Sequence, residues 1–418
     1  MKNFLVLALS GSGVLGGAET YVIRIITWLK NHGIPVMLMH KENENFHPIV
    51  EERLNELNVE RLVLPSLKSN QTLPDFWRAK FSFPENSHVR IICFQSPANF
   101  FAAEMIKRRA KKYKVSTFHY MIHQDDYCRN KTQATSNKIF QGILRYSYKS
   151  ILKKMDKMKN TIYLSEDYSR LIHANFNLPD MQKDYNLIRL GIKINDLDIE
   201  KVKNRFLNKP FSILTMTRFD FPEKSYLLGL IDEFSHLCAK YPDIRLVIIG
   251  AGEGELKLKA QIDKQDENIR KNISLVGIIP YDKLDSYFEE ATVYIGIATT
   301  VLDASNSGLL SVISKVNSNE CSSPGLFFEN PNDIYGYSQG SAARDVIERI
   351  IAMSEREYLE SNYKNYDALS KTYDIDVIMP KLLELENKSK KPTLSIARLF
   401  LIRSMRFVID TALRLKKR

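Results

Sequence analysis

The sequence predicts an α/β fold with two tandem Rossmann-like domains, and three observations support this prediction. The chain has 418 residues, which suits two domains of roughly 100–200 residues each. Short apolar runs alternate with segments in which apolar residues recur at helical spacing. The same alternation starts again near Phe211. Such a rhythm is typical of a parallel sheet with helices on both faces.

The first domain is expected over residues 1–200. Its predicted strands are FLVLAL, IPVMLMH, RLVLP, VRIICFQ, KVSTFHY and TIYLS. The first run enters a glycine-rich loop and is followed at once by an amphipathic helical pattern, AETYVIRIITWL. A secretory signal peptide is the alternative interpretation of this N-terminus. The helix that follows favours a buried first strand.

The second domain is expected over residues 206–350, after a polar linker from Lys193 to Pro210. Its predicted strands are FSILTMTR, RLVIIGAG, ISLVGII, TVYIGIA and LLSVIS, with helices at YLLGLIDEFSHLCAKY and YDKLDSYFEEA. Residues 351–387 are expected to form closing helices that cross back to the first domain. Ligands of such domains bind beyond the carboxyl ends of the strands, so a cleft between the two domains is the expected site.

Charge and cysteine content narrow the class of protein. The four cysteines are scattered, with no C-x-x-C pair, which indicates reduced thiols in a cytoplasmic protein. The chain has no run of roughly 18 apolar residues of the kind that spans a membrane. Residues 388–418 carry ten basic residues and one acidic residue, and so +9 of the net charge of +11. The excess charge belongs to a C-terminal tail.

The glycine loop has the spacing of a dinucleotide-binding fingerprint, G-x-G-x-x-G, at Gly11, Gly13 and Gly16. Glycines permit close backbone approach, and the helix that follows offers N–H groups to an anion. A dinucleotide enzyme also needs a carboxylate at the end of the second strand, where this chain has His40 and Lys41. A nicotinamide-dependent oxidoreductase and a purely structural turn therefore stay open.

Two cations follow the first strand of the second domain, in TMTRFDFPEKS. Arg218 and Lys224 are six residues apart and can close together on a diphosphate. A nicotinamide enzyme has no need of such a pair. A solvated basic loop is the alternative for either charge alone.

The ordered set of motifs resembles the glycosyltransferases of GT-B fold, in particular the family 4, or group 1, type. The matching residues are Gly16, Gly17, Ala18 and Glu19, then Arg218, Glu223 and Lys224, then Gly250 and Gly252, then Val276, Gly277 and Pro280. The resemblance covers roughly residues 1–385. The order of the motifs is more specific than any one of them.

The resemblance implies a role for each matching residue. The implied catalytic residues are His119, Arg218 and Lys224, and the implied donor-binding residues are Gly16, Gly17, Gly250, Gly252, Gly277, Thr299, Thr300 and Asp303. The glycines bring backbone amides close to the donor, the two cations neutralise the diphosphate leaving group, and Asp303 accepts hydrogen bonds from the ribose. His119 is expected near the reacting sugar, although a core imidazole is its ordinary interpretation. No metal and no cofactor beyond a UDP- or GDP-linked sugar is implied.

The chain departs from the family pattern on the side that contacts the sugar. Ile295 stands where the first acid of the family's pair belongs, Leu310 replaces a proline, and Ser225 replaces a common glycine. Some members lack the first acid and keep a glycine–threonine loop, as residues 296–300 do here. A catalytically silent relative, acting as a binding or partner subunit, is therefore the main alternative.

Two Asp-x-Asp patterns, Asp196 with Asp198 and Asp374 with Asp376, have the spacing of a metal site on a diphosphate. Neither follows a strand of a nucleotide-binding domain. We interpret both as solvated positions, and no metal site is predicted.

The basic clusters at 107–114 and 145–159 and the tail at 388–418 favour an anionic membrane surface as a partner. The tail is predicted to be an amphipathic helix with arginines opposite its apolar face. A helix docked on the protein itself is the alternative. No nucleic-acid motif accompanies the clusters, so no nucleic acid is expected.

The resulting hypothesis is a cytoplasmic, peripheral-membrane hexosyltransferase, retaining and metal-independent. Its predicted acceptor is a lipid-linked glycan or a cell-surface polysaccharide, and the residue usage is suggestive of bacterial polysaccharide biosynthesis.

Overall fold

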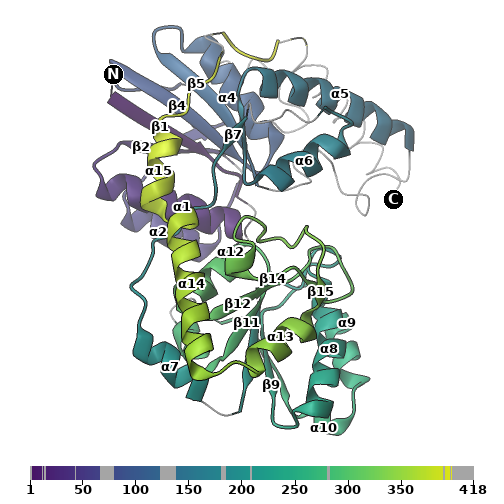
Figure 1. The fold of residues 1–418 in the computed structure, drawn as a ribbon. Helices are drawn as coiled ribbons and strands as arrows, with labels where there is room; N and C mark the ends of the chain where they lie inside the picture. Colours follow the sequence, from purple (N-terminus) through teal and green to yellow (C-terminus); the bar gives the residue numbers. More distant parts are fainter. Residues whose placement is uncertain are drawn as a thin grey trace. The chain divides into compact units, whose positions relative to one another are not determined.

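The computed structural model divides into two compact units (Figure 1). The first comprises Met1–Gly191 with Ile378–Arg418, and the second comprises Ile192–Val377. The structure describes residues 2–11, 13, 16–42, 44–65, 80–122, 138–179, 185–207, 210–279, 283–388, 391–395 and 397. The predicted α/β class is confirmed in both units.

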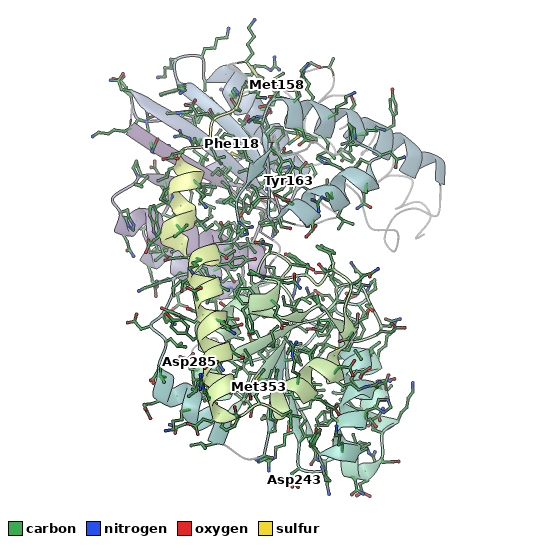
Figure 2. The ribbon with its side chains drawn as sticks, viewed as in Figure 1. Phe118, Met158, Tyr163, Asp243, Asp285 and Met353 are labelled. Carbon is green, nitrogen blue, oxygen red and sulfur yellow. The ribbon has the colours of Figure 1, made fainter. Side chains whose placement is uncertain are left out.

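The first unit contains a seven-stranded parallel sheet in the order β3-β2-β1-β4-β5-β6-β7. Its strands are β1 (Lys2–Ala8), β2 (Val36–Lys41), β3 (Glu60–Leu64), β4 (Ser87–Phe94), β5 (Lys114–Met121), β6 (Thr161–Tyr163) and β7 (Asn186–Leu187). All except the two-residue β7 were expected from apolar runs. Phe118 and Tyr163 are fully buried in this unit (Figure 2).

The helices of the first unit are α1 (Gly17–Asn31), α2 (Pro48–Glu56), α4 (Pro97–Arg109), α5 (Lys138–Lys157) and α6 (Glu166–Asn175). The first of them, α1, buries one stripe at helical spacing, which includes Tyr21, Val22, Ile25 and Leu29. Because α4 packs against β1, β4 and β5, even its Glu104 is fully buried.

The second unit contains a six-stranded sheet in the order β10-β9-β8-β11-β12-β14. Its parallel strands are β8 (Ser212–Met216), β9 (Arg245–Ile249), β10 (Ile273–Gly277), β11 (Val293–Gly296) and β12 (Leu310–Ile313). The two-residue β14 (Gly325–Leu326) pairs antiparallel with β12, and β13 (Ser322–Ser323) pairs with β15 (Ser341–Ala342). Asp243 lies just before β9, at the amino-terminal edge of the sheet (Figure 2).

Helices form two groups in the second unit. One group is α8 (Tyr226–Lys240), α9 (Glu255–Asp263), α10 (Glu267–Arg270) and α13 (Ala343–Ile351), and α8 packs against both α9 and α13. The other is α7 (Ile199–Leu207), α11 (Leu284–Glu290), α12 (Thr299–Asn306) and α14 (Glu355–Tyr373), in which α14 packs against α7 and α12.

The unit boundaries differ from the sequence prediction. The first boundary lies at Gly191 and not near residue 200, because α7 of the expected linker belongs to the second unit. Arg205 on α7 is 2% exposed and donates to the carbonyl oxygens of Phe288, Ser307 and Gly308 at 2.8–3.0 Å. Those buried bonds hold the segment in place.

The expected closing helices also divide between the units. The long helix α14 belongs to the second unit, whereas residues from Ile378, within α15 (Ile375–Leu383), belong to the first. Most of the predicted tail helix and Pro280 lie outside the described residues. Residues 388 and 391–395 do not form a separate tail, since they bond to the first unit, as described below.

Candidate active site

The sheet order of the second unit creates a switch point between β8 and β11. The chain runs from β8 through β9 to β10 on one side, and then crosses to β11 on the other side of β8. The connections that leave β8 and β11 therefore diverge, and the crevice at such a point is where open α/β sheets bind ligands. Residues 217–225 and 297–298 border it.

The loop after β8 is braced by backbone hydrogen bonds. Phe219 donates to the Ala251 carbonyl at 3.0 Å and accepts from the Gly254 amide at 2.8 Å. The Asn317 amide donates to the Glu223 carbonyl at 3.0 Å. The loop backbone is thus held from two sides.

The predicted donor-binding glycines of this unit serve that bracing. A Cβ on Gly250 would lie 1.8 Å from the Thr217 carbonyl oxygen, and its φ of 141° suits glycine. Gly252 has a φ of 158° and its Cβ would lie 2.8 Å from the Phe219 nitrogen. Gly277 accepts from the Gly250 amide at 2.8 Å. These contacts explain Gly250 and Gly252 by loop packing, and a φ of 84° explains Gly277. Contact of the three glycines with a donor stays a prediction.

Arg218 and Lys224 both lie in the braced loop. Arg218 is half exposed and pairs with Asp220 at 3.0 Å. Lys224 is mostly buried and pairs with Glu223 at 2.8 Å. An exposed ion pair of this kind contributes little free energy, typically about 0–1 kcal/mol, so an incoming diphosphate can replace Asp220 as the partner of Arg218.

The other border of the crevice is the start of α12. Ala298, the residue before it, has φ 60° and ψ −139°, which is a strained conformation for any residue but glycine. Thr299 and Thr300 form the first turn and are partly exposed, and Asp303 is partly buried in the same helix. A helix start offers N–H groups and a positive dipole end to an anion.

Tyr294 on β11 connects the two borders. Its hydroxyl donates to the Met216 carbonyl at 3.1 Å, and Thr300 is a second side-chain partner. Burial raises the pKa of Tyr294 well above its usual value. This neutral, buried phenol was missed in the sequence, where it reads only as an apolar strand residue. Ile295 beside it is fully buried in the core.

The first unit has a switch point of the same kind between β1 and β4. Gly16 precedes α1 and Gly17 begins it. A Cβ on Gly16 would lie 2.7 Å from a carboxylate oxygen of Glu19, which is 2% exposed. Gln95, which directly follows β4, has a φ of 60° and donates from Nε2 to the same carboxylate at 3.1 Å. Gln95 was not predicted, because no local pattern marks it.

His119 lies within β5 and is fully buried. Burial lowers the pKa of the imidazole to about 3, and a hydrogen bond with the Gln95 backbone partly opposes that shift. The ring stacks on Phe100 with centroids 6.1 Å apart. The enclosed, neutral ring packs in the core and supports Gln95, and its expected place near the reacting sugar stays a prediction.

One aspartate of each Asp-x-Asp pattern accepts a hydrogen bond from a backbone amide at the start of a helix. Asp198 accepts from the Lys201 amide at 3.1 Å, and Asp374 accepts from the Asp376 amide at 2.9 Å. Among the described residues, no group of three or more His, Cys, Asp and Glu side chains is placed to hold a metal ion. In the same part of the chain, no helix combines the length and apolar character needed to cross a membrane.

Comparison with solved structures identifies the fold. The fold is similar to the lipopolysaccharide outer core galactosyltransferase WaaB, with a TM-score of 0.58, 14% identity, and coverage of 91% of this chain and 98% of that one. A glycosyltransferase from Rickettsia africae gives a TM-score of 0.59 at 12% identity, over 92% of this chain and 97% of that one. The two parallel sheets thus form the GT-B fold.

Sequence comparison finds a family match within the second unit. The profile of the family "Glycosyl transferases group 1" matches residues 197–321, which include both borders of the second switch point. An uncharacterized glycosyltransferase of Methanocaldococcus jannaschii is 22% identical over 285 residues, 60% of this chain and 68% of its own. Residues 197–321 thus resemble the group 1 glycosyltransferases, and the fold of the chain is similar to that of GT-B glycosyltransferases.

Proposed function

We propose that the protein transfers a sugar from a UDP- or GDP-linked donor to a lipid-linked or cell-surface glycan, with retention of configuration. The observation that carries the proposal is the placement of Arg218 and Lys224 in a rigid loop at the second switch point. In the reaction, the bond from the anomeric carbon to the diphosphate breaks and a bond to the acceptor oxygen forms. The acceptor proton leaves with the nucleoside diphosphate or through solvent.

The chemistry assigned to this loop is stabilisation of the leaving group. Negative charge grows on the diphosphate as the anomeric bond breaks, and two cations fixed nearby stabilise that charge more in the transition state than in the ground state. The start of α12 adds oriented amides on the facing border. We propose that these groups act without a metal ion.

Related structures support the choice of donor and acceptor. Two similar structures contain UDP: Staphylococcus aureus TarM, together with α-GlcNAc-glycerol, and the pneumococcal O-GlcNAc transferase GtfA, together with GlcNAc. The galactosyltransferase WaaB is named for the lipopolysaccharide outer core. By analogy, we propose a surface-glycan or lipid-linked acceptor and a site of action at the cytoplasmic face of a membrane.

A silent relative is the second candidate. It is favoured by the buried Ile295 in place of an acid, and by the enclosure of His119. A nicotinamide enzyme is disfavoured, since Lys41 at the end of β2 pairs with Glu44 at 2.9 Å where a ribose-binding carboxylate belongs.

Calorimetric titration with UDP, GDP and NAD tests the proposal. One nucleoside diphosphate is expected to bind, and Arg218→Ala is expected to weaken that binding at least tenfold. Arg349→Ala is the matched control. Arg349 lies on α13, away from the switch point, and is 49% exposed and ion-paired with Glu329 at 2.8 Å.

Each outcome has a distinct meaning. Binding that survives in Arg218→Ala contradicts the diphosphate assignment. Nucleotide binding without hydrolysis or transfer of any donor sugar favours the silent relative, and binding of NAD alone removes the glycosyltransferase proposal.

A further inference from the structure

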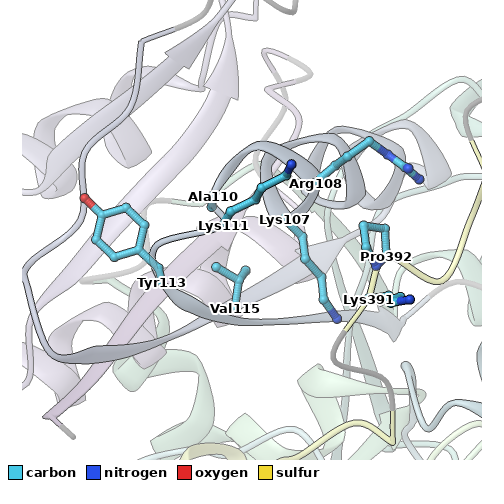
Figure 3. Close-up of a pocket in the computed structure, with 8 residues that line it drawn as sticks. All are labelled: Lys107, Arg108, Ala110, Lys111, Tyr113, Val115, Lys391 and Pro392. Atoms are coloured by element: carbon cyan, nitrogen blue, oxygen red, sulfur yellow. The ribbon is translucent and has the colours of Figure 1, made fainter.

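A cavity of about 350 Å³ opens in the first unit, where α4 ends and β5 begins (Figure 3). It is lined by Lys107, Arg108, Ala110, Lys111, Tyr113, Val115, Lys391 and Pro392. Four of these eight side chains are cationic, and none is acidic. The cavity is large enough for a phosphate-bearing group and falls in the size range of small-ligand sites.

The lining is partly buried, which distinguishes it from a solvated basic surface. Lys107 is 6% exposed, and burial lowers its pKa while the carboxylate of Glu104 opposes that shift. Arg108 carries a buried Nε–H without a hydrogen-bond partner among the described residues. A buried donor left in this state destabilises the fold, and an anionic acceptor would remove that penalty.

Glu104 does not neutralise the cavity in full, because it is one carboxylate behind four cationic side chains. One oxygen accepts from the Thr117 hydroxyl at 2.6 Å, and the other accepts from the Leu394 amide at 2.8 Å. Glu104 is itself fully buried behind the lining. The four cationic side chains of the lining therefore exceed the charge of this one buried carboxylate.

The C-terminal segment completes the cavity. Arg108 donates to the Leu394 carbonyl at 2.6 Å, and the Thr393 hydroxyl donates to Asn160 at 2.8 Å. Both Thr393 and Leu394 are buried. These bonds place Lys391 opposite the end of α4, although the two segments are far apart in the sequence.

The cavity is separate from the switch point of the first unit. It lies beside the first residues of β5, whereas Gly16 and Gln95 lie beyond the carboxyl ends of β1 and β4. In a parallel sheet, the amino-terminal ends of all strands lie on one side and the carboxyl ends lie on the opposite side. A ligand here would not compete with one at the switch point.

We propose that this cavity is a phosphate-binding site, which takes either the phosphate of an anionic lipid headgroup or a soluble phosphate compound. Cations from two segments surround the group, and the planar guanidinium of Arg108 suits paired phosphate oxygens. The inference is independent of the transfer reaction, and its test needs no activity measurement.

The test uses the full chain, two probes and two double variants. The probes are inorganic pyrophosphate, followed by calorimetry, and vesicles of phosphatidylcholine with or without an equal part of phosphatidylglycerol, followed by sedimentation. The pocket variant is Lys111→Gln with Lys391→Gln, both exposed residues of the lining. The control is Lys112→Gln with Lys153→Gln, which removes the same charge from exposed positions outside the lining.

We expect the pocket variant to lose about thirtyfold in affinity for one probe, at about 1 kcal/mol for each lysine, and the control to lose several times less. Loss of pyrophosphate binding identifies a soluble ligand, and loss on anionic vesicles alone identifies a lipid headgroup. Equal losses in the two variants overturn the proposal, as does a wild-type chain that binds neither probe.

Discussion

The two switch points of this protein have the same topology and different construction. Each has a non-glycine residue with a φ of 60° after one of its two strands. This residue is Gln95 after β4 in the first unit and Ala298 after β11 in the second. In the first unit, buried side chains hold the loop, through Glu19 and His119. In the second, backbone bonds around glycines hold the loop and leave Arg218 half exposed.

This difference separates two ways to build a site. A loop held by its own backbone is rigid while its charged side chains stay available to contact an anion. A loop held by buried side chains commits those side chains to structure. We therefore expect the second switch point to be the better anion site, and four predictions test the contrast.

The largest expected effect is on the glycine loops. Gly250→Ala should destabilise the second unit by about 4 kcal/mol, since the Cβ meets the Thr217 carbonyl and the φ of 141° is strained for alanine. Gly13→Ala, with a φ of 70° and nothing within 4 Å of the Cβ, should cost only about 1 kcal/mol. Denaturant unfolding followed by circular dichroism measures both, and equal losses would contradict the packing role of Gly250.

The next effect is on turnover. Lys224→Met should lower kcat by about a hundredfold or more, equivalent to roughly 3 kcal/mol, with little change in unfolding free energy. Lys240→Met is the control, because Lys240 is an exposed, ion-paired lysine at the end of α8. The measurement compares kcat and KM of the wild type and both variants, from initial rates with the donor identified by calorimetry. A change confined to KM would show that Lys224 binds ground state and transition state alike.

Acid should affect the two units unequally. The unfolded chain protonates His119 near 6.5, whereas its pKa in the folded unit is about 3, so its contribution is complete above pH 6.5 and falls as pH decreases toward 3. Between pH 6.5 and pH 5 the loss is about 2 kcal/mol. The second unit has only the exposed His236.

The measurement can separate the units, because both tryptophans, Trp28 and Trp77, precede residue 192. Tryptophan fluorescence should report an earlier acid transition than far-ultraviolet circular dichroism. His119→Gln should reduce the pH dependence by about one proton. Coincident transitions in the wild-type chain would show that the units unfold together.

The smallest effect concerns the two residues with positive φ. Ala298→Gly should stabilise the second unit by about 1 kcal/mol, because glycine relieves strain and the lost side chain is small. Gln95→Gly should instead destabilise the first unit by about 1 kcal/mol, since it also removes the hydrogen bond to the buried Glu19. Thermal unfolding of the two variants shows whether each substitution raises or lowers stability. Changes in the same direction would contradict the contrast between the switch points.

Sequence alone was sufficient for the elements with strong periodicity. All five long parallel strands of the second unit and six of the first follow from apolar runs, and α1 and α8 follow from helical spacing. The sequence also placed Arg218 and Lys224 in the loop after β8, where the structure has them, and their contact with a donor stays a prediction. Local patterns of this kind report which residues are buried, and burial sets the element.

Only the tertiary structure decided which distant groups meet. Arg205 and Lys107 are buried although no local pattern marks them. The hydrogen bonds from Gln95 to Glu19 and from Leu394 to Glu104 join residues that share no local pattern. It likewise enclosed His119 and made Gly250 a packing residue. The physical reason is that periodicity records a residue's average environment, whereas a hydrogen bond or a close approach depends on a partner that the fold supplies from elsewhere in the chain.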